Sequence, residues 1–211
     1  MFPNKTVING KTILAIGSHP DDIELGCGGS LLYFSRQGYQ IYTVICSYGE
    51  LKSPTKVRKD ENIKSNRYLN TKKTYCLGLK DGEINHNTKL VNLLENIVNE
   101  VKPNIIFSHS LRDHHQDHLN VARATISALR HKKTTLIMYP NLSSICQPKF
   151  NFYIDISKFM TQKLEIINNF ESQKSNWYMN TNYLTSCAIS AGHLINCEYA
   201  ERFFLYFSCL D

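Results

Sequence analysis

The stretch ILAIGSHPDDIELGCGGSLL, residues 13–32, decides how the rest of the chain is organised. Its apolar start, Ile13 to Ile16, predicts a buried strand, and the glycine-containing segment at its end predicts a helix. Strand, tight loop and helix in this order is how a parallel α/β domain presents side chains at the carboxyl end of a strand. The loop carries His19, Asp21 and Asp22, three groups that are able to bind a metal or transfer a proton.

The composition is that of an ordinary globular protein, with 42% hydrophobic and 20% charged residues among 211. This length suits one domain, and we expect residues 1–211 to form it. The net charge of +6 is dispersed, which disfavours nucleic acid as a partner. The N-terminal MFPNKTVINGK lacks the apolar core of a signal peptide, and no apolar run reaches membrane-spanning length. We therefore expect a cytoplasmic protein without a membrane segment.

The seven cysteines are scattered, without any Cys-x-x-Cys pair, and several lie in apolar runs where buried thiols are common. They are Cys27, Cys46, Cys76, Cys146, Cys187, Cys197 and Cys209.

Strand-like and helix-like segments alternate over the first two thirds of the chain. Strands are expected at 12–18, 40–46, 74–77, 104–108 and 134–139, and helices at 23–37, 56–69, 90–101 and 119–129. This alternation predicts an α/β fold with a Rossmann-like, doubly wound and mostly parallel sheet. A C-terminal extension should add a strand at 152–156, a helix at 157–170 and an edge strand at 205–209.

A second polar cluster, RDHHQDH at 112–118, follows the fourth expected strand. In a sheet ordered 3-2-1-4-5, strands one and four are neighbours whose connections diverge, and that divergence opens a crevice at their carboxyl ends. This order, which is assumed, brings both clusters to one crevice. His118 would then join His19 and Asp22 as a set of two histidines and one carboxylate. Such a set, with one open position, suits catalytic zinc, and Asp21 beside it could take a proton from water.

Each cluster alone has an ordinary structural explanation, because His-x-x-Asp is common in capped turns and histidine-rich loops are common on surfaces. Their joint occurrence after two buried strands favours function. Together, HPDDIE at 19–24 and HQDH at 115–118 resemble the PIG-L/LmbE-like superfamily of zinc-dependent N-acetylglucosamine deacetylases. Weaker matches extend over nearly the whole chain: Gly49-Glu50, Arg58 with Glu61, Asp81-Gly82, Asp155-Ile156 with Lys163, Ser172-Gln173 and residues 199–203.

The resemblance implies roles for individual residues. It implies His19, Asp22 and His118 as ligands of Zn²⁺, with Fe²⁺ as the alternative, and Asp21 as the general base. It implies His115 as the protonated group that stabilises the oxyanion or protonates the leaving amine. The remaining implied roles are Asp117 as the residue that holds and tunes His115, and Arg58 and Asp81 as substrate-binding residues.

In one respect the sequence departs from this pattern, because Asp113 stands where some members have a tyrosine that would support the oxyanion. The glycines of the first helix do not match Gly-x-Gly-x-x-Gly and favour close helix–strand packing.

Several other residues have both a structural and a functional interpretation. Packing or surface positions are expected for His86, His109 and His131, whereas His193 is a weaker candidate for the pocket wall. Trp177, Tyr178 and Tyr183 are typical of core or surface packing and also of a wall on which a sugar stacks.

We therefore expect a metal-dependent hydrolase of carbohydrate metabolism that removes acetyl from an N-acetylated amino sugar or its conjugate. Self-association as a homo-oligomer is compatible with the sequence. Two alternatives stay open: a metal-dependent phosphoesterase, which usually needs additional carboxylates for a second metal, and a non-catalytic module that binds a sugar or a metal.

Overall fold

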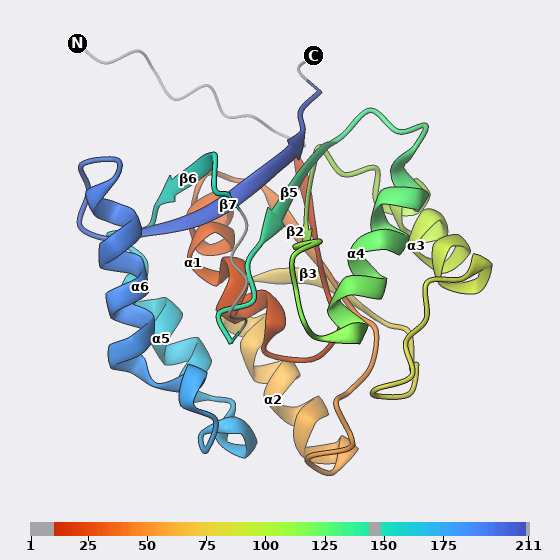
Figure 1. Cartoon of the computed structure of the whole chain (residues 1–211), viewed down its shortest axis with the longest axis horizontal. Helices are drawn as coiled ribbons and strands as arrows, with labels where there is room; N and C mark the ends of the chain where they lie inside the picture. Colours follow the sequence, from red (N-terminus) through yellow and green to blue (C-terminus); the bar gives the residue numbers. More distant parts are fainter. Residues whose placement is uncertain (1–10, 144–148, 210–211) are drawn as a thin grey trace.

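The computed structural model describes residues 11–143 and 149–209, which form one seven-stranded sheet with helices on both faces (Figure 1). The strands are β1 (Thr12–Gly17), β2 (Gln40–Ile45), β3 (Thr71–Cys76), β4 (Ile105–His109), β5 (Thr135–Tyr139), β6 (Phe152–Asp155) and β7 (Ala200–Phe207). The helices are α1 (Asp22–Arg36), α2 (Thr55–Tyr68), α3 (Thr88–Val101), α4 (Gln116–Leu129), α5 (Met160–Asn168) and α6 (Thr181–His193), with 3-10 turns at Glu171–Gln173 and Trp177–Met179.

The strand order is β3-β2-β1-β4-β5-β7-β6, and the first five strands are parallel. The expected doubly wound, mostly parallel sheet and its 3-2-1-4-5 order are thereby confirmed. β1 lies between β2 and β4, so the loops that leave β1 and β4 diverge at this point of the sheet. A crevice forms where connections diverge in this way.

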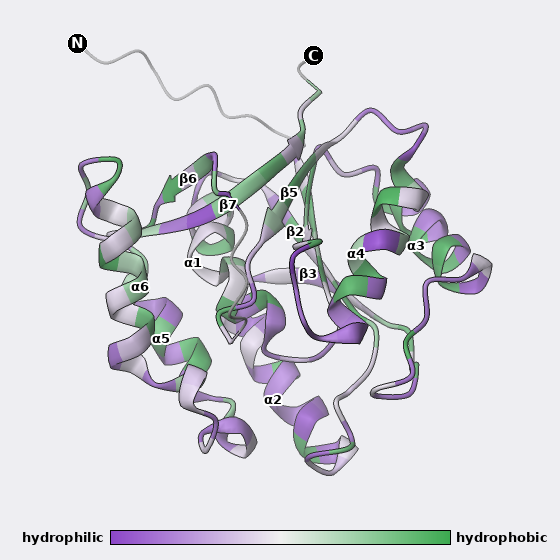
Figure 2. Ribbon diagram, in the orientation of Figure 1, coloured by the Kyte–Doolittle hydropathy of each residue, from purple (hydrophilic) through white to green (hydrophobic). Residues whose placement is uncertain are grey.

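β1 lies at the centre because every one of its residues is buried. Ile13 and Ala15 belong to the core on one face of the sheet, whereas Leu14 and Ile16 belong to the core on the other. This alternation is the twofold period of a strand. Helices α1, α5 and α6 cover the first face and α3 and α4 the second, and the apolar colours of Figure 2 gather between these layers.

The glycines of α1 have the packing role that the sequence favours. A Cβ atom at Gly26 would overlap the ring of Tyr139 in β5, and one at Gly29 would lie 2.8 Å from Ile156. α1 therefore approaches the sheet and the segment after β6 more closely than a larger residue would allow.

The C-terminal part contains the main corrections to the expected fold. The strand expected at an edge is β7, which is longer, begins at Ala200 and lies between β5 and β6, antiparallel to both. The start of this strand is not predicted from the sequence because of Glu201, since a charged residue is uncommon in a core strand. Here Glu201 pairs with Lys163 at 2.6 Å and accepts the backbone N–H groups of Gly29 and Ser30.

Helix α6 and the two 3-10 turns were not predicted, because 181–193 lacks a clear apolar stripe. Among the described cysteines, Cys27 and Cys46 are buried and Cys76 and Cys209 are exposed, while Cys146 lies outside the described residues. A search of the described helices finds none with the length and apolar character needed to cross a membrane.

Candidate functional site

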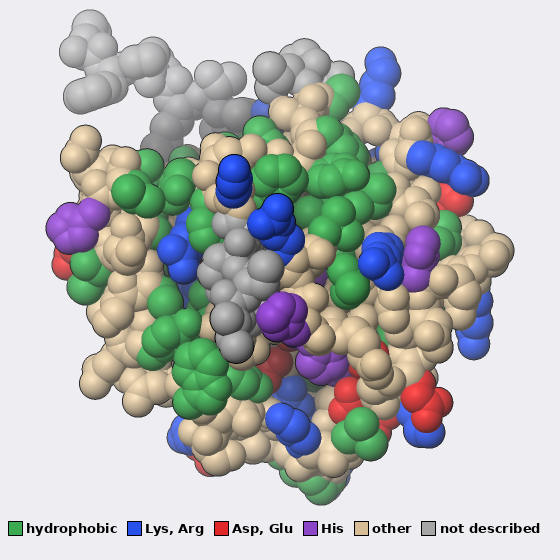
Figure 3. All heavy atoms as spheres, viewed as in Figure 1, with side chains coloured by type: hydrophobic (Ala, Val, Ile, Leu, Met, Phe, Trp, Pro, Cys, Tyr) green, Lys and Arg blue, Asp and Glu red, His purple; other side chains and the backbone are tan. Residues whose placement is uncertain are grey.

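A cavity of about 460 Å³ lies at the carboxyl ends of the parallel strands, where the loops after β1 to β5 meet. Figure 3 shows histidine, acidic and basic side chains close together on this face of the molecule. The residues of interest that line the cavity are His19, Asp21, Asp22, Gly49, Leu51, Arg58, Asp81, His115, His118, Asn141, Ser143, Gln173 and Tyr178.

The loop after β1 is fixed by its own side chains. The Asp22 carboxylate accepts the backbone N–H of His19 at 2.7 Å, which closes the loop in front of α1. Asp21 has φ 94°, a left-handed conformation that is costly for a residue other than glycine. This conformation turns the chain sharply into α1 while keeping His19 and Asp22 together.

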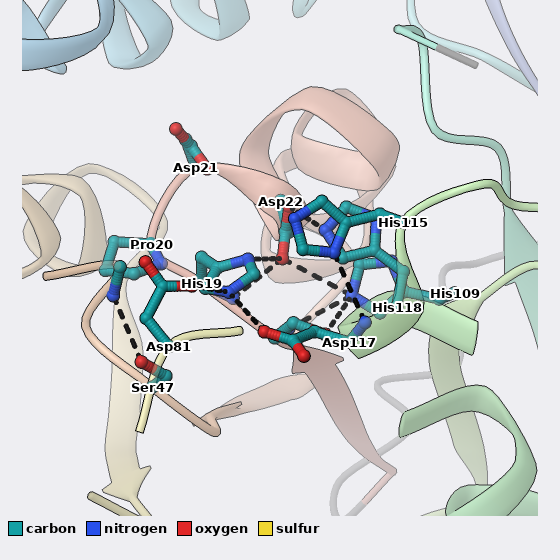
Figure 4. Close-up of polar contacts among 12 residues, drawn as sticks. His19, Pro20, Asp21, Asp22, Ser47, Asp81, His109, His115, Asp117 and His118 are labelled. Atoms are coloured by element: carbon teal, nitrogen blue, oxygen red, sulfur yellow. Dashed lines mark hydrogen bonds and ion pairs between the residues drawn. The ribbon is translucent and has the colours of Figure 1, made fainter. Parts of the chain in front are cut away.

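The three predicted ligands converge at the crevice (Figure 4). The Asp22 carboxylate lies 3.6 Å from His19 Nδ1 and 3.3 Å from His118 Nε2. Ligand atoms around tetrahedral zinc, at bond lengths of about 2.0–2.1 Å, are themselves about 3.3 Å apart. The two distances to Asp22 are therefore close to the separation of neighbouring ligands around a small divalent cation.

Each histidine of this set has a carboxylate behind its other nitrogen. His118 Nδ1 lies 2.8 Å from Asp113, and His19 Nε2 lies 2.9 Å from Asp81 and 3.2 Å from Asp117. A carboxylate in this position fixes the tautomer and leaves the opposite nitrogen free to bind a metal. The arrangement thus directs His19 Nδ1 and His118 Nε2 toward Asp22.

The electrostatics of the site favour positive charge. Burial lowers the pKa of His118, but Asp22 and Asp113 outweigh burial and raise it to about 9. Burial raises the pKa of Asp22, yet His118 holds it well below its usual range. A buried carboxylate that stays ionised needs a cation as its partner, and either a proton on His118 or a metal ion would serve.

The described side chains form three groups whose candidate ligand atoms lie within 4.8 Å of one another. They are His19 with His115 and His118, Asp22 with His109 and His118, and His19 with Asp81 and Asp117. Each contains one or two of the three predicted ligands and none contains all three, so further donors, among them His109 and His115, lie within reach of the same position.

His109 belongs to this site, although the sequence favoured a packing or surface position for it. It is 1% exposed, and its ring stacks on His118 with 4.1 Å between centroids. Its Nε2 accepts the backbone N–H of Ser18 at 3.0 Å, so this nitrogen carries no proton. Burial, and then His118, lower the pKa of His109 to about 4. His109 is therefore a neutral ring that positions His118 and the start of the β1 loop.

Asp21 lies beside Asp22 but points away from the histidines (Figure 4), and its carboxylate forms an ion pair with Arg58. Arg58 donates to its Oδ2 at 3.2 Å, whereas no described residue donates to Oδ1. Burial raises the pKa of Asp21 to about 7, with Arg58 acting in the opposite direction. Asp21 is thus a carboxylate with one oxygen open to the cavity and a pKa near neutrality, which suits a proton acceptor.

Arg58, for which the resemblance implies contact with substrate, lines the cavity, but its donors are directed at protein acceptors. Its side chain is 3% exposed, and its N–H groups bond to protein acceptors. Nε donates to the Tyr48 carbonyl at 3.3 Å, and Nη2 donates to the Pro20 carbonyl as well as to Asp21. Nη1 donates to Glu61 at 3.1 Å and to Ser172 at 3.4 Å. Five bonds occupy five donors, so Arg58 holds Asp21 in place.

His115 is at the N-terminus of α4, where its Nδ1 accepts the backbone N–H of Asp117 at 3.2 Å. A nitrogen that accepts cannot also be protonated, so this ring is neutral and its Nε2 carries the hydrogen. Burial, followed by the charges of His118 and His19, lowers the pKa of His115, which also favours the neutral ring. The expected protonated form is therefore disfavoured. Asp117 contacts His115 through its backbone N–H. Its carboxylate instead bonds to His19 and to the Gly82 N–H.

The other histidines singled out in the sequence lie away from the cavity. His193 and His131 are exposed and do not line it, while His86 contacts Ser127 at 3.1 Å. Tyr178 lines the cavity, whereas Trp177 is 60% exposed and packs edge-on against Tyr178.

Residues 14–129, more than half of the chain, match the family described as PIG-L, GlcNAc-PI de-N-acetylase. The chain belongs to the PIG-L family. It is 33% identical over 127 residues to the uncharacterized deacetylase YaiS of Escherichia coli, which covers 57% of this chain and 69% of that protein. This PIG-L chain is therefore a member of a deacetylase family.

Solved structures show the same fold. N,N'-diacetylchitobiose deacetylase from Pyrococcus horikoshii aligns with a TM-score of 0.83 at 23% identity, over 93% of this chain and 84% of that one. GalB, the 4-carboxy-2-hydroxymuconate hydratase of Pseudomonas putida, aligns at 0.81 and 18% identity, over 96% and 98%. Because the fold occurs with different chemistries, the reaction of this PIG-L protein must be argued from its site.

Proposed function

We propose that the whole chain is a single deacetylase domain that removes acetyl from an N-acetylated amino sugar or its conjugate with the help of a divalent cation. One observation carries this proposal: His19 Nδ1 and His118 Nε2 both approach Asp22 at one edge of a cavity that Asp21 also lines. Imidazole and carboxylate donors suit Zn²⁺, our first choice, and also Fe²⁺. When bound, the cation would act as a Lewis acid that polarises the acetyl carbonyl and makes water nucleophilic.

Asp21 would move the proton in this reaction. Its ionised Oδ1 takes a proton from the water that attacks the acetyl carbonyl, and the carboxyl then gives that proton to the departing nitrogen. The C–N bond breaks as the nitrogen is protonated, which yields acetate and a free amine. Arg58 keeps Oδ2 engaged, so that Oδ1 is the oxygen presented to the cavity.

His115 would stabilise the negative charge that develops on the carbonyl oxygen. The neutral ring offers Nε2–H as a donor, since Nδ1 accepts from the Asp117 backbone. A fixed donor aimed at a developing oxyanion is worth roughly 10²–10³-fold in rate. Neutral His115 leaves Asp21 as the group that protonates the amine.

The cavity wall fits a sugar. Asn141, Ser143 and Gln173 offer polar atoms, and Tyr178 offers a ring face on which a sugar could stack. Asp81 also lines the cavity, but its Oδ1 bonds to His19 and its Oδ2 accepts the Leu51 N–H. We propose that the main role of Asp81 is to orient His19, and that contact with substrate hydroxyls is a lesser role.

The decisive experiment supplies the metal-loaded protein with a panel of N-acetylated amino sugars and measures acetate and primary amine in equal amounts. Phosphate release from phosphate esters in place of acetate would identify a phosphoesterase. Saturable sugar binding without either product would identify a binding module.

Asp113 is predicted to support metal binding without itself being a ligand. In the Asp113→Asn variant, His118 Nδ1 keeps a hydrogen-bond acceptor but loses the charge 2.8 Å away. Loss of such a carboxylate weakens metal binding by roughly 10–100-fold. Competition with a chromophoric chelator measures the affinity, and Asp60→Asn on exposed α2 is the control. Unchanged affinity would show that Asp113 serves packing alone.

Arg58 is predicted to set the pH range of activity. Its positive charge lowers the pKa of Asp21, so Arg58→Gln should raise that pKa further. The ionised fraction of Asp21 at pH 7 then falls, and the rise of kcat/KM with pH should move to higher pH. Metal content should not change. A pH profile that superimposes on that of the wild type would contradict the assigned role.

A further inference from the structure

A second hollow, of about 700 Å³, lies between α2 and the edge strand β3. It shares no lining residue with the catalytic cavity. Six of its lining residues recur at intervals of three and four along α2 and the turn after it, so they occupy one helix face. These are Lys59, Asn62, Ile63, Asn66, Arg67 and Asn70.

This face is unusual for a helix that covers a sheet. A covering helix normally presents an apolar stripe, but α2 buries only Arg58, Glu61, Asn62 and Ser65 and is largely hydrophilic (Figure 2). The strand residues opposite are small or polar: Thr71, Thr74 and Cys76. Short strand residues beneath a polar helix face leave the space unfilled.

The lining has the donors of an anion site. It contains Lys59 and Arg67 but no acidic residue, and neither cation forms an ion pair with any residue in the described ranges. The Lys59 ammonium lies 4.7 Å from the centroid of the Tyr48 ring, another lining residue, which keeps it in place. Two positive charges without a protein partner attract an anion.

One buried polar atom in the same hollow also lacks a partner. The Thr71 hydroxyl is buried and forms no hydrogen bond within residues 11–143 or 149–209. The side chain of Asn62 lines the hollow beside it. Because an unpaired buried polar group is costly, the Thr71 hydroxyl indicates a polar occupant.

We propose that this hollow binds a phosphate monoester of a sugar-sized polyol. Arg67 would take the phosphate through two parallel N–H bonds, which its planar guanidinium favours. Lys59 lies eight residues earlier, about 12 Å along the helix axis, so the amide of Asn62 lies between the two cations, where hydroxyl groups would sit. The volume lies within the usual range of small-molecule sites, roughly 300–1,000 Å³.

Isothermal titration calorimetry with glucose 6-phosphate tests the proposal, with glucose and inorganic phosphate as comparison probes. We expect saturable binding of glucose 6-phosphate by the wild type and none of glucose. Arg67→Gln should weaken this binding about tenfold or more, because a charge-assisted bidentate contact is lost. Lys64→Gln, on α2 but outside the hollow, should bind like the wild type. Hydrogen exchange on the wild type should show protection of residues 59–70 by glucose 6-phosphate, which needs no variant to fold.

Three results would overturn the proposal. The first is absence of glucose 6-phosphate binding, and the second is equal binding by the wild type and Arg67→Gln. The third is binding of inorganic phosphate with equal affinity, which would reveal an adventitious ion only. If light scattering shows a dimer that Arg67→Gln dissociates, and glucose 6-phosphate does not bind, the face contacts a second copy instead.

Discussion

Replacing Asp21 with asparagine should remove most of the turnover and leave the bound metal in place. A general base contributes roughly 10²–10⁴-fold to rate, and an amide cannot take the proton from water. The substitution keeps the shape of the side chain, so the left-handed turn at φ 94° and the contact with Arg58 have little reason to change. Steady-state kinetics and elemental analysis on the same preparation separate loss of catalysis from loss of metal.

The pH profile provides a second measurement on the same variant. Burial raises the pKa of Asp21 to about 7, and only the ionised form accepts a proton. The kcat/KM of the wild type should therefore rise as pH increases through about 7, and this rise should vanish in the residual activity of Asp21→Asn. Asp60→Asn is the control. An Asp21→Asn enzyme with full metal and near-wild-type deacetylation would exclude Asp21 as the base.

The parallel half of the sheet was predictable because its strands are short apolar runs separated by recognisable helices. β1 is buried on both faces, and a short continuous apolar run such as ILAI is typical of a strand in the centre of a parallel sheet. β7 was misplaced because Glu201 interrupts its apolar pattern, and the partner that permits this charge, Lys163, is 38 residues away. Long-range pairing of that kind leaves no local signal.

The same distinction explains which site residues the sequence could indicate. His19, Asp22 and His118 belong to two dense clusters, and both clusters follow buried strands. His109 and Asp113 lie next to the second cluster, but their roles depend on ring stacking and on a bond to His118 Nδ1. The signal that could have found His109 is its position as the last residue of β4, at the end of the strand that faces the crevice.

Arg58 and His115 show how hydrogen-bond geometry bears on a role that resemblance implies. In sequence, an arginine on a charged helix is a natural candidate for contact with substrate. In the structure its donors are engaged by Tyr48, Glu61 and other protein acceptors, which turns it into a support for Asp21. For His115, one backbone N–H decides the tautomer. Such bonds arise from the packing of several loops, which local patterns do not encode.

Replacing His118 with alanine should remove both the bound cation and the activity. The variant keeps His19 and Asp22, and two ligands do not hold a catalytic zinc that normally uses three. Lewis-acid stabilisation supplies several kcal/mol to the transition state, so turnover should fall by about 10³-fold or more.

Two controls separate the loss of a metal ligand in His118→Ala from a general loss of stability. His131→Ala removes an exposed histidine after α4 and should retain both metal and activity. Dialysis of the wild type against a chelator should reproduce the His118→Ala defect, and one equivalent of Zn²⁺ should reverse it in the wild type alone. Circular dichroism checks that the variant folds, because Asp22 and Asp113 lose a buried partner at 3.3 and 2.8 Å. Full metal occupancy in folded His118→Ala would remove His118 from the ligand set, and the convergence on Asp22 would then need another explanation.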